Sequence, residues 1–338
     1  MMLIDPKHRF YLSLAGSLLR RPRLKIWLNY LKFRLSVGRV RGHGPDRLNF
    51  APPSVTIWVT SRCNKVCQFC FYRGELNSGD AADLDMTFDR FLEMIDHPLV
   101  SRSLRICLYG GEPLLNEDLF RMVATAKKRG HLVTVSTNAL LLARRMSEAT
   151  ATPPHVWSIS YYPEDHPKVS GAILSVARET PVLLRFLLAQ DSMDEVDKVL
   201  DFAARAGVRI VMLEHLRPTA LSDRRPLPDD DGRIERLRAE MNKRYGKRIL
   251  LSWPAVAQAD REGRPASCCQ FWNSLFVDVR GRISPCCDWP MSTYVEPILT
   301  GDSWNSHRMM SLRCDMRNGI YPDYCRKCVY LYDDFLRI

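Results

Sequence analysis

The sequence predicts an α/β fold, a partial (β/α)6 barrel of the TIM type followed by a small C-terminal domain. The first observation is six short apolar or β-branched runs, at residues 54–60, 103–110, 131–137, 155–162, 181–189 and 207–216. After the first run, successive starts lie 24 to 28 residues apart, the length of one strand, one helix and two short loops. The second observation is that helix-like segments separate the runs. The third is that the repeat ends after residue 216. Strands alternating with helices predict a parallel sheet with helices packed outside.

The segments between the runs carry signals for helix starts and stops. Asn116 is placed to cap a helix over residues 117–130, and Gly130 stands where a left-handed residue ends a helix. Ser192 and Gly207 bracket a second helix in the same way. The first helix has apolar positions at helical spacing, at Leu119, Met122, Val123 and Ala126. In barrels of this kind the chemistry takes place on loops that follow the carboxyl ends of the strands.

Charge and composition divide the chain into four predicted regions. They are a basic amphipathic arm at 1–50, the barrel core at 51–220, a linker and helix at 221–250, and a small cysteine-rich domain at 251–338. The net charge is +11, and the arm, with eleven basic and two acidic residues, accounts for +9 of it. The remainder is nearly neutral, so the basic charge belongs to the arm.

Within the arm, the segment LKIWLNYLKFRLSVGRV at 24–40 predicts an amphipathic helix. Its apolar face is expected to contain Leu24, Trp27, Leu28, Leu31 and Leu35. Such a helix packs on the barrel, lies on an anionic membrane surface, or binds an acidic peptide or nucleic acid. The sequence leaves these alternatives open.

The chain contains no run of 18 apolar residues and no signal peptide at its start, which predicts a cytoplasmic location, with peripheral membrane contact as one interpretation of the arm. In a reducing compartment the cysteines are expected to bind metal or take part in redox chemistry rather than form disulfides. Their distribution supports this expectation because they cluster at 63, 67 and 70, at 107, and at 268, 269, 286, 287, 314, 325 and 328.

The stretch SRCNKVCQFCFYR, residues 61–73, places Cys63, Cys67 and Cys70 on the loop after the first strand. Three thiolates within eight residues, with no histidine nearby, indicate a metal or cluster that keeps one coordination position open. Iron–sulfur clusters accept such loops. A zinc site and ordinary packing are the alternatives.

A second motif, YGGEPLL at 109–115, ends the second strand. Paired glycines allow a backbone to approach a ligand closely, and the Glu112 carboxylate is able to receive an ammonium group. A plain strand-to-helix turn is the alternative.

Together, C-x3-C-x2-C after the first strand and GGEP after the second resemble the radical S-adenosylmethionine (SAM) enzymes. The resemblance implies a [4Fe-4S] cluster on Cys63, Cys67 and Cys70, whose open iron chelates the amino and carboxylate groups of the methionyl moiety of SAM. It also implies a one-electron donor of the flavodoxin or ferredoxin type, and a 5'-deoxyadenosyl radical that removes a hydrogen atom from the substrate.

The resemblance extends to further positions. It implies that Phe69 packs near the adenine and that Gly110, Gly111 and Glu112 bind the methionyl amine. Contacts to the ribose or carboxylate are implied for Ser136, Asn138, Ser158 and Ser160. Arg185 is expected to reach the methionyl carboxylate or to pair with a neighbouring acid. Leu213 is expected to pack on the adenine or to lie in the core.

The C-terminal cysteines resemble the auxiliary-cluster extensions called SPASM and twitch domains. Gly281 predicts a hairpin between SLFVDV and RISPCC. The resemblance implies one auxiliary [4Fe-4S] cluster, on Cys269, Cys286, Cys325 and Cys328, with Cys268 and Cys287 as alternates and zinc as the rival. Cys314 is interpreted as a hydrogen-atom donor to the substrate radical or as a partly buried thiol. Cys107 is interpreted as a core residue.

The predicted function is that of a radical SAM enzyme that oxidises, crosslinks or epimerises a peptide or natural product. The alternative within this class is a dehydrogenase or epimerase acting on a small sugar-like or lipid-linked metabolite. A zinc-stabilised basic nucleic-acid-binding protein is the alternative of another class. The nearly neutral charge beyond residue 50 disfavours nucleic acid as a partner.

Overall fold

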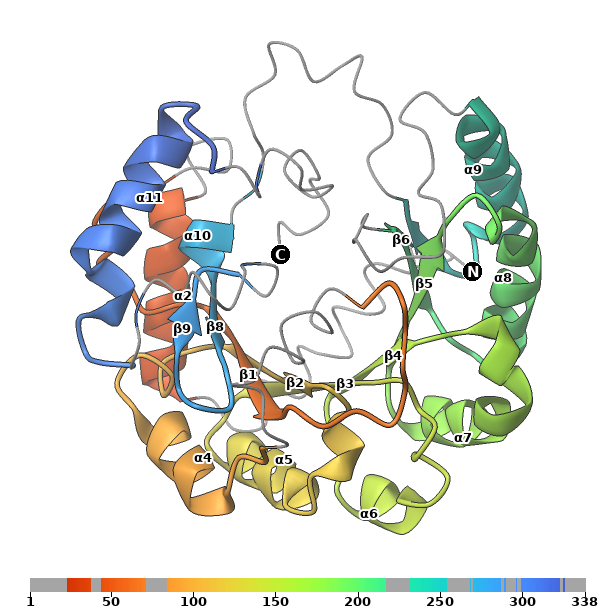
Figure 1. Cartoon of the computed structure of the whole chain (residues 1–338), viewed down its shortest axis with the longest axis horizontal. Helices are drawn as coiled ribbons and strands as arrows, with labels where there is room; N and C mark the ends of the chain where they lie inside the picture. The colour runs from red at the N-terminus through yellow and green to blue at the C-terminus, as the bar shows by residue number, and fades with distance from the viewer. Residues whose placement is uncertain are drawn as a thin grey trace.

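The computed structural model describes residues 23–37, 44–70, 84–216, 232–253, 268, 270–286, 289, 296, 299–322 and 325. Within these residues the strands form one sheet with the order β7-β6-β5-β4-β3-β2-β1-β8-β9, and this sheet curves into an arc that is not closed (Figure 1). Neighbouring strands from β7 to β8 are parallel, and only the short β9 is antiparallel to its neighbour. The prediction of a partial barrel of parallel strands is therefore confirmed.

All six predicted strands are present, each within or at the bounds of its apolar run. They are β1 (Ser54–Thr60), β2 (Arg105–Gly110), β3 (Leu132–Thr137), β4 (Val156–Ser160), β5 (Val182–Leu188) and β6 (Ile210–His215). The sheet continues at its edges with β7 (Leu250–Ser252), β8 (Ser274–Val277) and β9 (Ile283–Ser284).

Helices cover the outer face of the sheet (Figure 1). Those around the barrel are α4 (Phe88–Asp96), α5 (Leu119–Lys128), α6 (Met146–Ala151), α7 (His166–Glu179), α8 (Val196–Arg205) and α9 (Gly232–Tyr245). Near β8 and β9 lie α2 (Leu24–Val37), α10 (Gln270–Asn273) and α11 (His307–Arg317). The four apolar positions predicted for α5 are all fully buried, which confirms its helical spacing.

The two predicted helix caps differ from the structure. The helix after Asn116 begins at Leu119, and the Asn116 side chain accepts a hydrogen bond from the Asp118 amide while donating to Val59 O and Met86 O. Ser192 stands at the N-cap position of the 3-10 helix Met193–Glu195 that precedes α8, but its side chain makes no capping hydrogen bond. Its hydroxyl instead accepts from the Ala189 amide and donates to Leu187 O. Both side chains therefore fasten loops to strand ends. The helix stops are confirmed, with positive φ values at Gly130 (89°) and Gly207 (72°).

The helix of the basic arm is present, but its predicted apolar face is not the buried one. The buried residues of α2 are Ile26, Asn29, Phe33 and Val37. The leucines of the predicted apolar face, Leu24, Leu28, Leu31 and Leu35, are exposed. The helix has two opposite apolar stripes, and the stripe that contains Asn29 meets the barrel. Contact of the leucine face with a membrane surface or an acidic partner stays a prediction.

The predicted C-terminal hairpin is confirmed. β8 pairs antiparallel with β9, and Gly281 has φ 83° in the turn between them. β8 also pairs in parallel with β1, so the barrel sheet continues into the region expected to form a separate small domain. The predicted region boundaries are otherwise untested and stay predictions.

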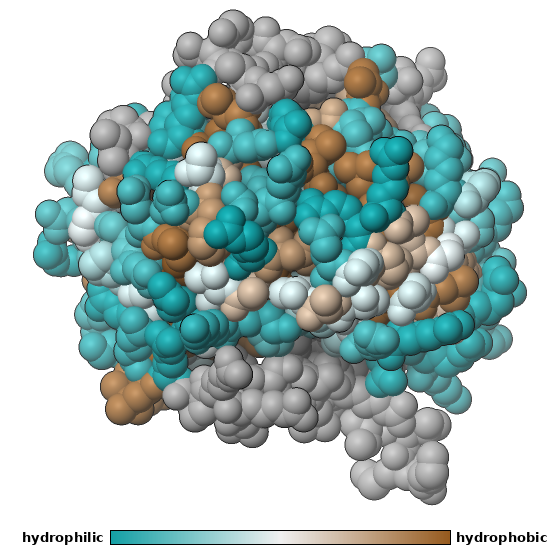
Figure 2. Space-filling model, turned by 90° about the horizontal axis from the view of Figure 1, so that it is seen from below, coloured by the Kyte–Doolittle hydropathy of each residue, from teal (hydrophilic) through white to brown (hydrophobic). Residues whose placement is uncertain are grey.

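None of the described helices is long and apolar enough to cross a membrane. On the face seen in Figure 2, hydrophilic residues predominate and hydrophobic residues lie in smaller groups among them.

Candidate active site

The candidate site lies at the carboxyl ends of β1 to β6, where the cysteine loop begins. Strand register shows which side chains share the inner face of the barrel, because residues paired across parallel strands point the same way. Ser136 pairs with Ser158, Ser160 pairs with Arg185, and Arg185 pairs with Met212. The predicted residues Ser136, Ser158, Ser160 and Arg185 are thus brought to one inner surface spanning β3, β4 and β5.

The cysteine loop, residues 61–70, follows β1 directly. Cys63 is exposed and Cys67 and Cys70 are half-buried, and the Cys70 amide donates to Cys67 O at 3.1 Å. Burial raises the pKa of Cys63, and burial raises the pKa of Cys67 to about 11, with smaller contributions from the other cysteines of the loop. These effects show that the three thiols lie close enough to influence one another. Deprotonating them for metal binding would release protons.

The two glycines of the GGEP motif hold this loop against β2. A Cβ atom on Gly110 would lie 2.3 Å from Thr60 O, and one on Gly111 would lie 2.2 Å from Arg62 O. The same close approach lets the Gly111 amide donate to Thr60 O at 2.9 Å and the Glu112 amide donate to Arg62 O at 2.8 Å. The close approach of the cysteine loop is therefore one reason why these two positions require glycine.

Glu112 connects the ends of β2 and β3. Its buried carboxylate accepts from Thr137 Oγ1 at 2.7 Å, from the Asn138 amide at 2.8 Å and from the Leu114 amide at 3.1 Å. Burial raises the pKa of Glu112 to about 7, although these three hydrogen bonds oppose the shift. Hydrogen bonds from the chain's own groups therefore hold the carboxylate in place between the ends of β2 and β3. The prediction that it also receives an ammonium group stays a prediction.

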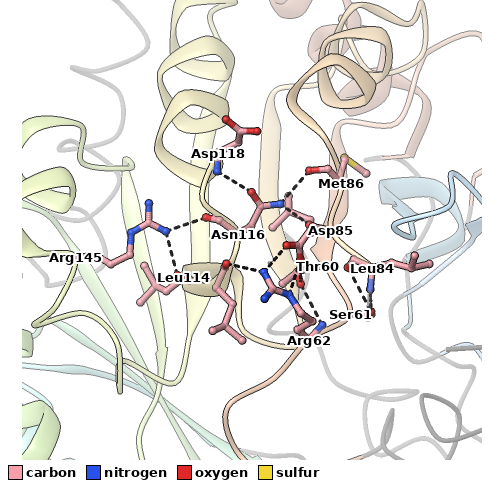
Figure 3. Close-up of polar contacts among 12 residues, drawn as sticks. Thr60, Ser61, Arg62, Leu84, Asp85, Met86, Leu114, Asn116, Asp118 and Arg145 are labelled. Carbon is pink, nitrogen blue, oxygen red and sulfur yellow. Dashed lines mark hydrogen bonds and ion pairs between the residues drawn. The ribbon is translucent and has the colours of Figure 1, made fainter. Parts of the chain in front are cut away.

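A polar network anchors the start of the cysteine loop (Figure 3). Arg62 forms an ion pair with Asp85 and donates to Leu115 O at 2.9 Å, while Thr60 Oγ1 donates to Asp85 at 2.5 Å. Arg145 donates to Leu114 O and Asn116 O and so holds the turn after the GGEP motif from the other side. The loop is therefore fixed at its base by contacts from several elements.

The far side of the loop is attached to the end of β4 by residues that sequence reasoning missed. Lys65 Nζ lies 2.5 Å from Asp165 and 4.3 Å from the centroid of the Tyr162 ring. Tyr162 also lies beside Cys67, and burial together with the nearby Cys67 raises the pKa of the Tyr162 phenol. Burial lowers the pKa of Lys65, but the hydrogen bond to Asp165 and the negative charges of Asp165 and Glu164 together outweigh burial, so the net pKa is raised. A lysine inside the cysteine triplet was the only sequence signal for this cluster.

Two other predicted residues, Phe69 and Asn138, also contact the cysteine loop or the residues that hold it. The Phe69 ring is 6.0 Å from the ring of Tyr162, and Asn138 Nδ2 donates to Asn64 Oδ1 at 2.8 Å, which ties β3 to the cysteine loop. Ala139, just beyond, has φ 63°, an uncommon conformation for a residue other than glycine.

The sequence allows two interpretations for Arg185 and two for Leu213. The structure shows which residue Arg185 pairs with and which face of the sheet Leu213 occupies. Arg185 makes a two-pronged ion pair with Glu214, at 2.7 and 3.0 Å, which is the pairing with a neighbouring acid. Leu213 pairs with Phe186, not with Arg185, so it faces the helices on the outer side of the sheet. Leu213 is therefore corrected to a core residue, because its side chain points away from the inner surface.

The C-terminal cysteines are described only in part. Cys286 and Cys325, with the alternate Cys268, are half-buried and pack against the hydrophobic core. The other predicted ligands Cys269 and Cys328, and the alternate Cys287, lie outside the described residues. None of the eight described cysteines forms a disulfide bond. The auxiliary ligand set stays a prediction.

The remaining described cysteines are Cys314 and Cys107. Cys314 lies on α11, where it accepts a hydrogen bond from Asn318 Nδ2 at 3.5 Å, and its role as hydrogen donor stays a prediction. Cys107 pairs with Thr56 and Thr134 across β1, β2 and β3, which places it on the inner surface of the barrel. Burial raises its pKa, and Arg185 is close enough to oppose that shift. It is thus an interior thiol of the barrel rather than part of the packing under the helices.

The donor set of the cysteine loop fits an iron–sulfur cluster. Three thiols on one loop are held from three sides while the space beyond them is lined by polar side chains of β3 to β5. The described residues include no group of three His, Cys, Asp or Glu side chains gathered as around a single metal ion. A cluster does not require such a group, because each thiolate binds a different iron.

Comparison with known protein families decides the assignment. A sequence model described as the radical SAM superfamily matches residues 57–213, from β1 to β6. Residues 57–213 therefore form a radical SAM domain. A radical SAM domain uses a [4Fe-4S] cluster and SAM, so the match favours this prediction over the zinc-stabilised nucleic-acid-binding alternative. The assignment of Cys63, Cys67 and Cys70 as the ligands of that cluster stays a prediction.

Among curated relatives, the chain is 34% identical over 95 residues to the tungsten-containing aldehyde ferredoxin oxidoreductase cofactor-modifying protein of Pyrococcus furiosus, covering 28% of the chain and 26% of that protein. It is 22% identical over 315 residues to the PqqA peptide cyclase of Granulibacter bethesdensis, covering 82% of the chain and 79% of that protein. The first three curated relatives are matched over only 26%, 59% and 60% of their lengths.

Among solved structures, the fold is similar to SuiB of Streptococcus suis bound to S-adenosylmethionine, with a TM-score of 0.62 and 14% identity over 88% of this chain and 75% of that chain. SuiB bound to its precursor peptide SuiA is also similar, with a TM-score of 0.60 and 13% identity over 90% and 74% of the two chains. At these identities the likeness establishes the fold alone.

Proposed function

We propose that the protein is a radical SAM enzyme that removes a hydrogen atom from a peptide substrate. The observation that carries this proposal is the similarity to PqqA peptide cyclase, which extends over 82% of the chain and therefore beyond the barrel. The similarity of fold to SuiB, whose structure has been solved with a precursor peptide, supports it.

In this proposal the residues of the site have distinct tasks. Cys63, Cys67 and Cys70 hold the cluster, and the glycine turn at Gly110 and Gly111 keeps their loop in place beside the cofactor. When bound, the reduced cluster and SAM supply a 5'-deoxyadenosyl radical that takes hydrogen from the substrate. The half-buried Arg185 compensates the buried charge of Glu214 on the inner surface, where the methionyl group and the substrate would lie.

The C-terminal cysteines are assigned to one auxiliary [4Fe-4S] cluster on Cys269, Cys286, Cys325 and Cys328. An electron donor of the flavodoxin or ferredoxin type would reduce the first cluster. The auxiliary cluster would bind the substrate or accept an electron after hydrogen removal, which suits oxidation or crosslinking. Epimerisation would instead need a hydrogen donor, the task proposed for Cys314.

The test is anaerobic turnover of the reconstituted protein with peptides encoded beside its gene. Oxidation or crosslinking would appear in the mass spectrum as loss of two hydrogens, whereas epimerisation in deuterated water would add one deuterium without other change. In either case a peptide deuterated at the reacting position would transfer deuterium to 5'-deoxyadenosine. Label transfer from a small metabolite and from none of the peptides would contradict the proposal.

A further inference from the structure

The helix α2 has two opposite apolar faces, and only one of them meets the barrel. On the inner face, Phe33 packs edge-on against Phe50 at 5.5 Å. The buried Asn29 amide donates to Ala51 O and Arg102 O and accepts from the Ala51 amide. These contacts fix the rotation of the helix about its axis, so the opposite face is held outward.

The outward face carries a stripe of four leucines. Leu24, Leu28, Leu31 and Leu35 are 72%, 49%, 54% and 57% exposed. Their spacing of four, three and four residues aligns them along one side of the helix, over a length of roughly 16 Å. Among the described residues, only Val66 and Ile320 join them as exposed large hydrophobic side chains. Such a concentration on one surface marks an interaction site.

Cations flank this leucine stripe on both sides. At 100° per residue, Lys25 and Lys32 lie along one border of the stripe and Arg34 lies along the other. The sequence of α2 contains no acidic residue. An apolar line bordered by positive charge matches a surface that is negative at the level of polar headgroups and apolar just beneath them.

We propose that the leucine stripe of α2 docks on an anionic lipid membrane. The four leucines would enter the boundary between headgroups and acyl chains, while Lys25, Lys32 and Arg34 contact anionic headgroups. A second copy of the chain is a poorer occupant, because a symmetric contact through this stripe would bring the same cations of both copies together. Nucleic acid would leave the leucines exposed.

The position of α2 also sets the orientation of the docked protein. Asn29 contacts residues that precede β1 and β2, and Arg23 donates to Lys128 O, which precedes β3. The helix therefore crosses the amino ends of these strands, whereas the cysteine loop follows the carboxyl end of β1. Docking would turn the active site away from the bilayer, so the membrane would serve as an anchor and substrate would arrive from the aqueous side.

The experiment is vesicle flotation with the full-length reconstituted protein. The probes are phosphatidylcholine vesicles with and without about one third phosphatidylglycerol. The stripe variant is Leu28→Glu with Leu31→Glu, and its control is Ile320→Glu, a similarly exposed hydrophobic residue elsewhere. The charge variant is Lys25→Gln, Lys32→Gln and Arg34→Gln, and its control is Arg238→Gln, Lys243→Gln and Lys247→Gln on and just after α9.

Wild type and both controls should float with the anionic vesicles. The stripe and charge variants should each lose tenfold or more in partitioning, while keeping the wild-type circular dichroism spectrum and iron content. Equal binding to neutral vesicles, absence of wild-type binding, or unchanged binding of the stripe variant would overturn the proposal. A dimer in solution that the stripe variant abolishes would also overturn it and would assign the stripe to a second copy. Because no outcome uses catalysis, failure here leaves the proposed function intact.

Discussion

The buried carboxylate of Glu112 shows how a single residue can organise the cofactor site without touching the cysteines. It accepts hydrogen bonds from two donors at the end of β3 and from one donor in the turn between β2 and α5. The GGEP motif pointed to this residue from sequence. Its two partners at the end of β3 were not predictable, because that strand end lies 25 residues further along the chain.

Replacing Glu112 with Gln should lower the free energy of unfolding by about 1–3 kcal/mol, since the amide nitrogen cannot accept and one buried donor loses its partner. Urea unfolding of the variant measures this. Glu117→Gln, an exposed glutamate on the same loop, is the matched control and should change stability little. Equal stability of the two variants would contradict the role given to Glu112.

Lys65 is the second residue whose role follows from its surroundings. Asp165 is only 9% exposed at its side chain, and Lys65 is its close partner at 2.5 Å, whereas Lys168 lies 3.9 Å away and is 72% exposed. Lys65→Met should therefore cost about 1–3 kcal/mol of unfolding free energy by leaving the carboxylate poorly compensated. Lys168→Met should cost less than about 0.5 kcal/mol. If urea unfolding shows the same loss for both lysines, the attachment of the cysteine loop to β4 is not through Lys65.

At the scale of elements, the strand ends and the loops after them form the site. The six strands were predictable because apolar runs of strand length recur at the period of a β/α unit. The buried face of α2 was not predictable, because two apolar stripes lie on opposite sides of the helix. Only the tertiary contacts of Asn29 and Phe33 decide between them.

The contact between the β2 turn and the cysteine loop makes a prediction about Gly111. A methyl group there would lie 2.2 Å from Arg62 O, so Gly111→Ala should displace the loop and reduce iron retained after reconstitution several-fold. Gly171 in α7 has nothing within 4 Å of an added Cβ atom. Gly171→Ala should keep wild-type iron and raise stability by about 0.5–1 kcal/mol. Full iron retention in Gly111→Ala would show that the loop does not depend on this approach.

His131, at the amino end of β3, should make the free energy of unfolding depend on pH. His131 precedes β3 and donates from Nδ1 to Ser103 O at 2.7 Å, and its burial lowers its pKa to about 4. An unfolded histidine titrates near 6.5, so between about pH 6.5 and pH 4 the unfolded chain binds more protons and stability falls as the pH decreases.

His131→Gln should flatten this part of the stability profile by up to about 3 kcal/mol. Thermal unfolding followed by circular dichroism across this pH range measures the slope. A residual slope is expected because burial also lowers the pKa of His155 to about 4. A variant profile parallel to that of wild type would contradict the assignment to His131.

For the whole molecule, the site and α2 lie at opposite ends of an open parallel barrel. The barrel and the cysteine loop were predictable because their signals are local in sequence. The continuation of the sheet into the C-terminal region was not predictable, because β8 pairs with β1 across more than 200 residues of chain. The same long-range contact brings the region of the auxiliary cysteines into the barrel sheet, beside the strand that leads into the cysteine loop.

The central claim is that Cys63, Cys67 and Cys70 hold the cluster that cleaves SAM, and that the C-terminal cysteines hold a different one. Anaerobic reconstitution of wild type and of the triple variant Cys63→Ala, Cys67→Ala and Cys70→Ala, followed by reduction with SAM, tests it directly. Wild type should bind about eight irons and form 5'-deoxyadenosine, and the triple variant should retain about four irons and form none. Zinc without iron in wild type, or 5'-deoxyadenosine from the triple variant, would contradict the claim.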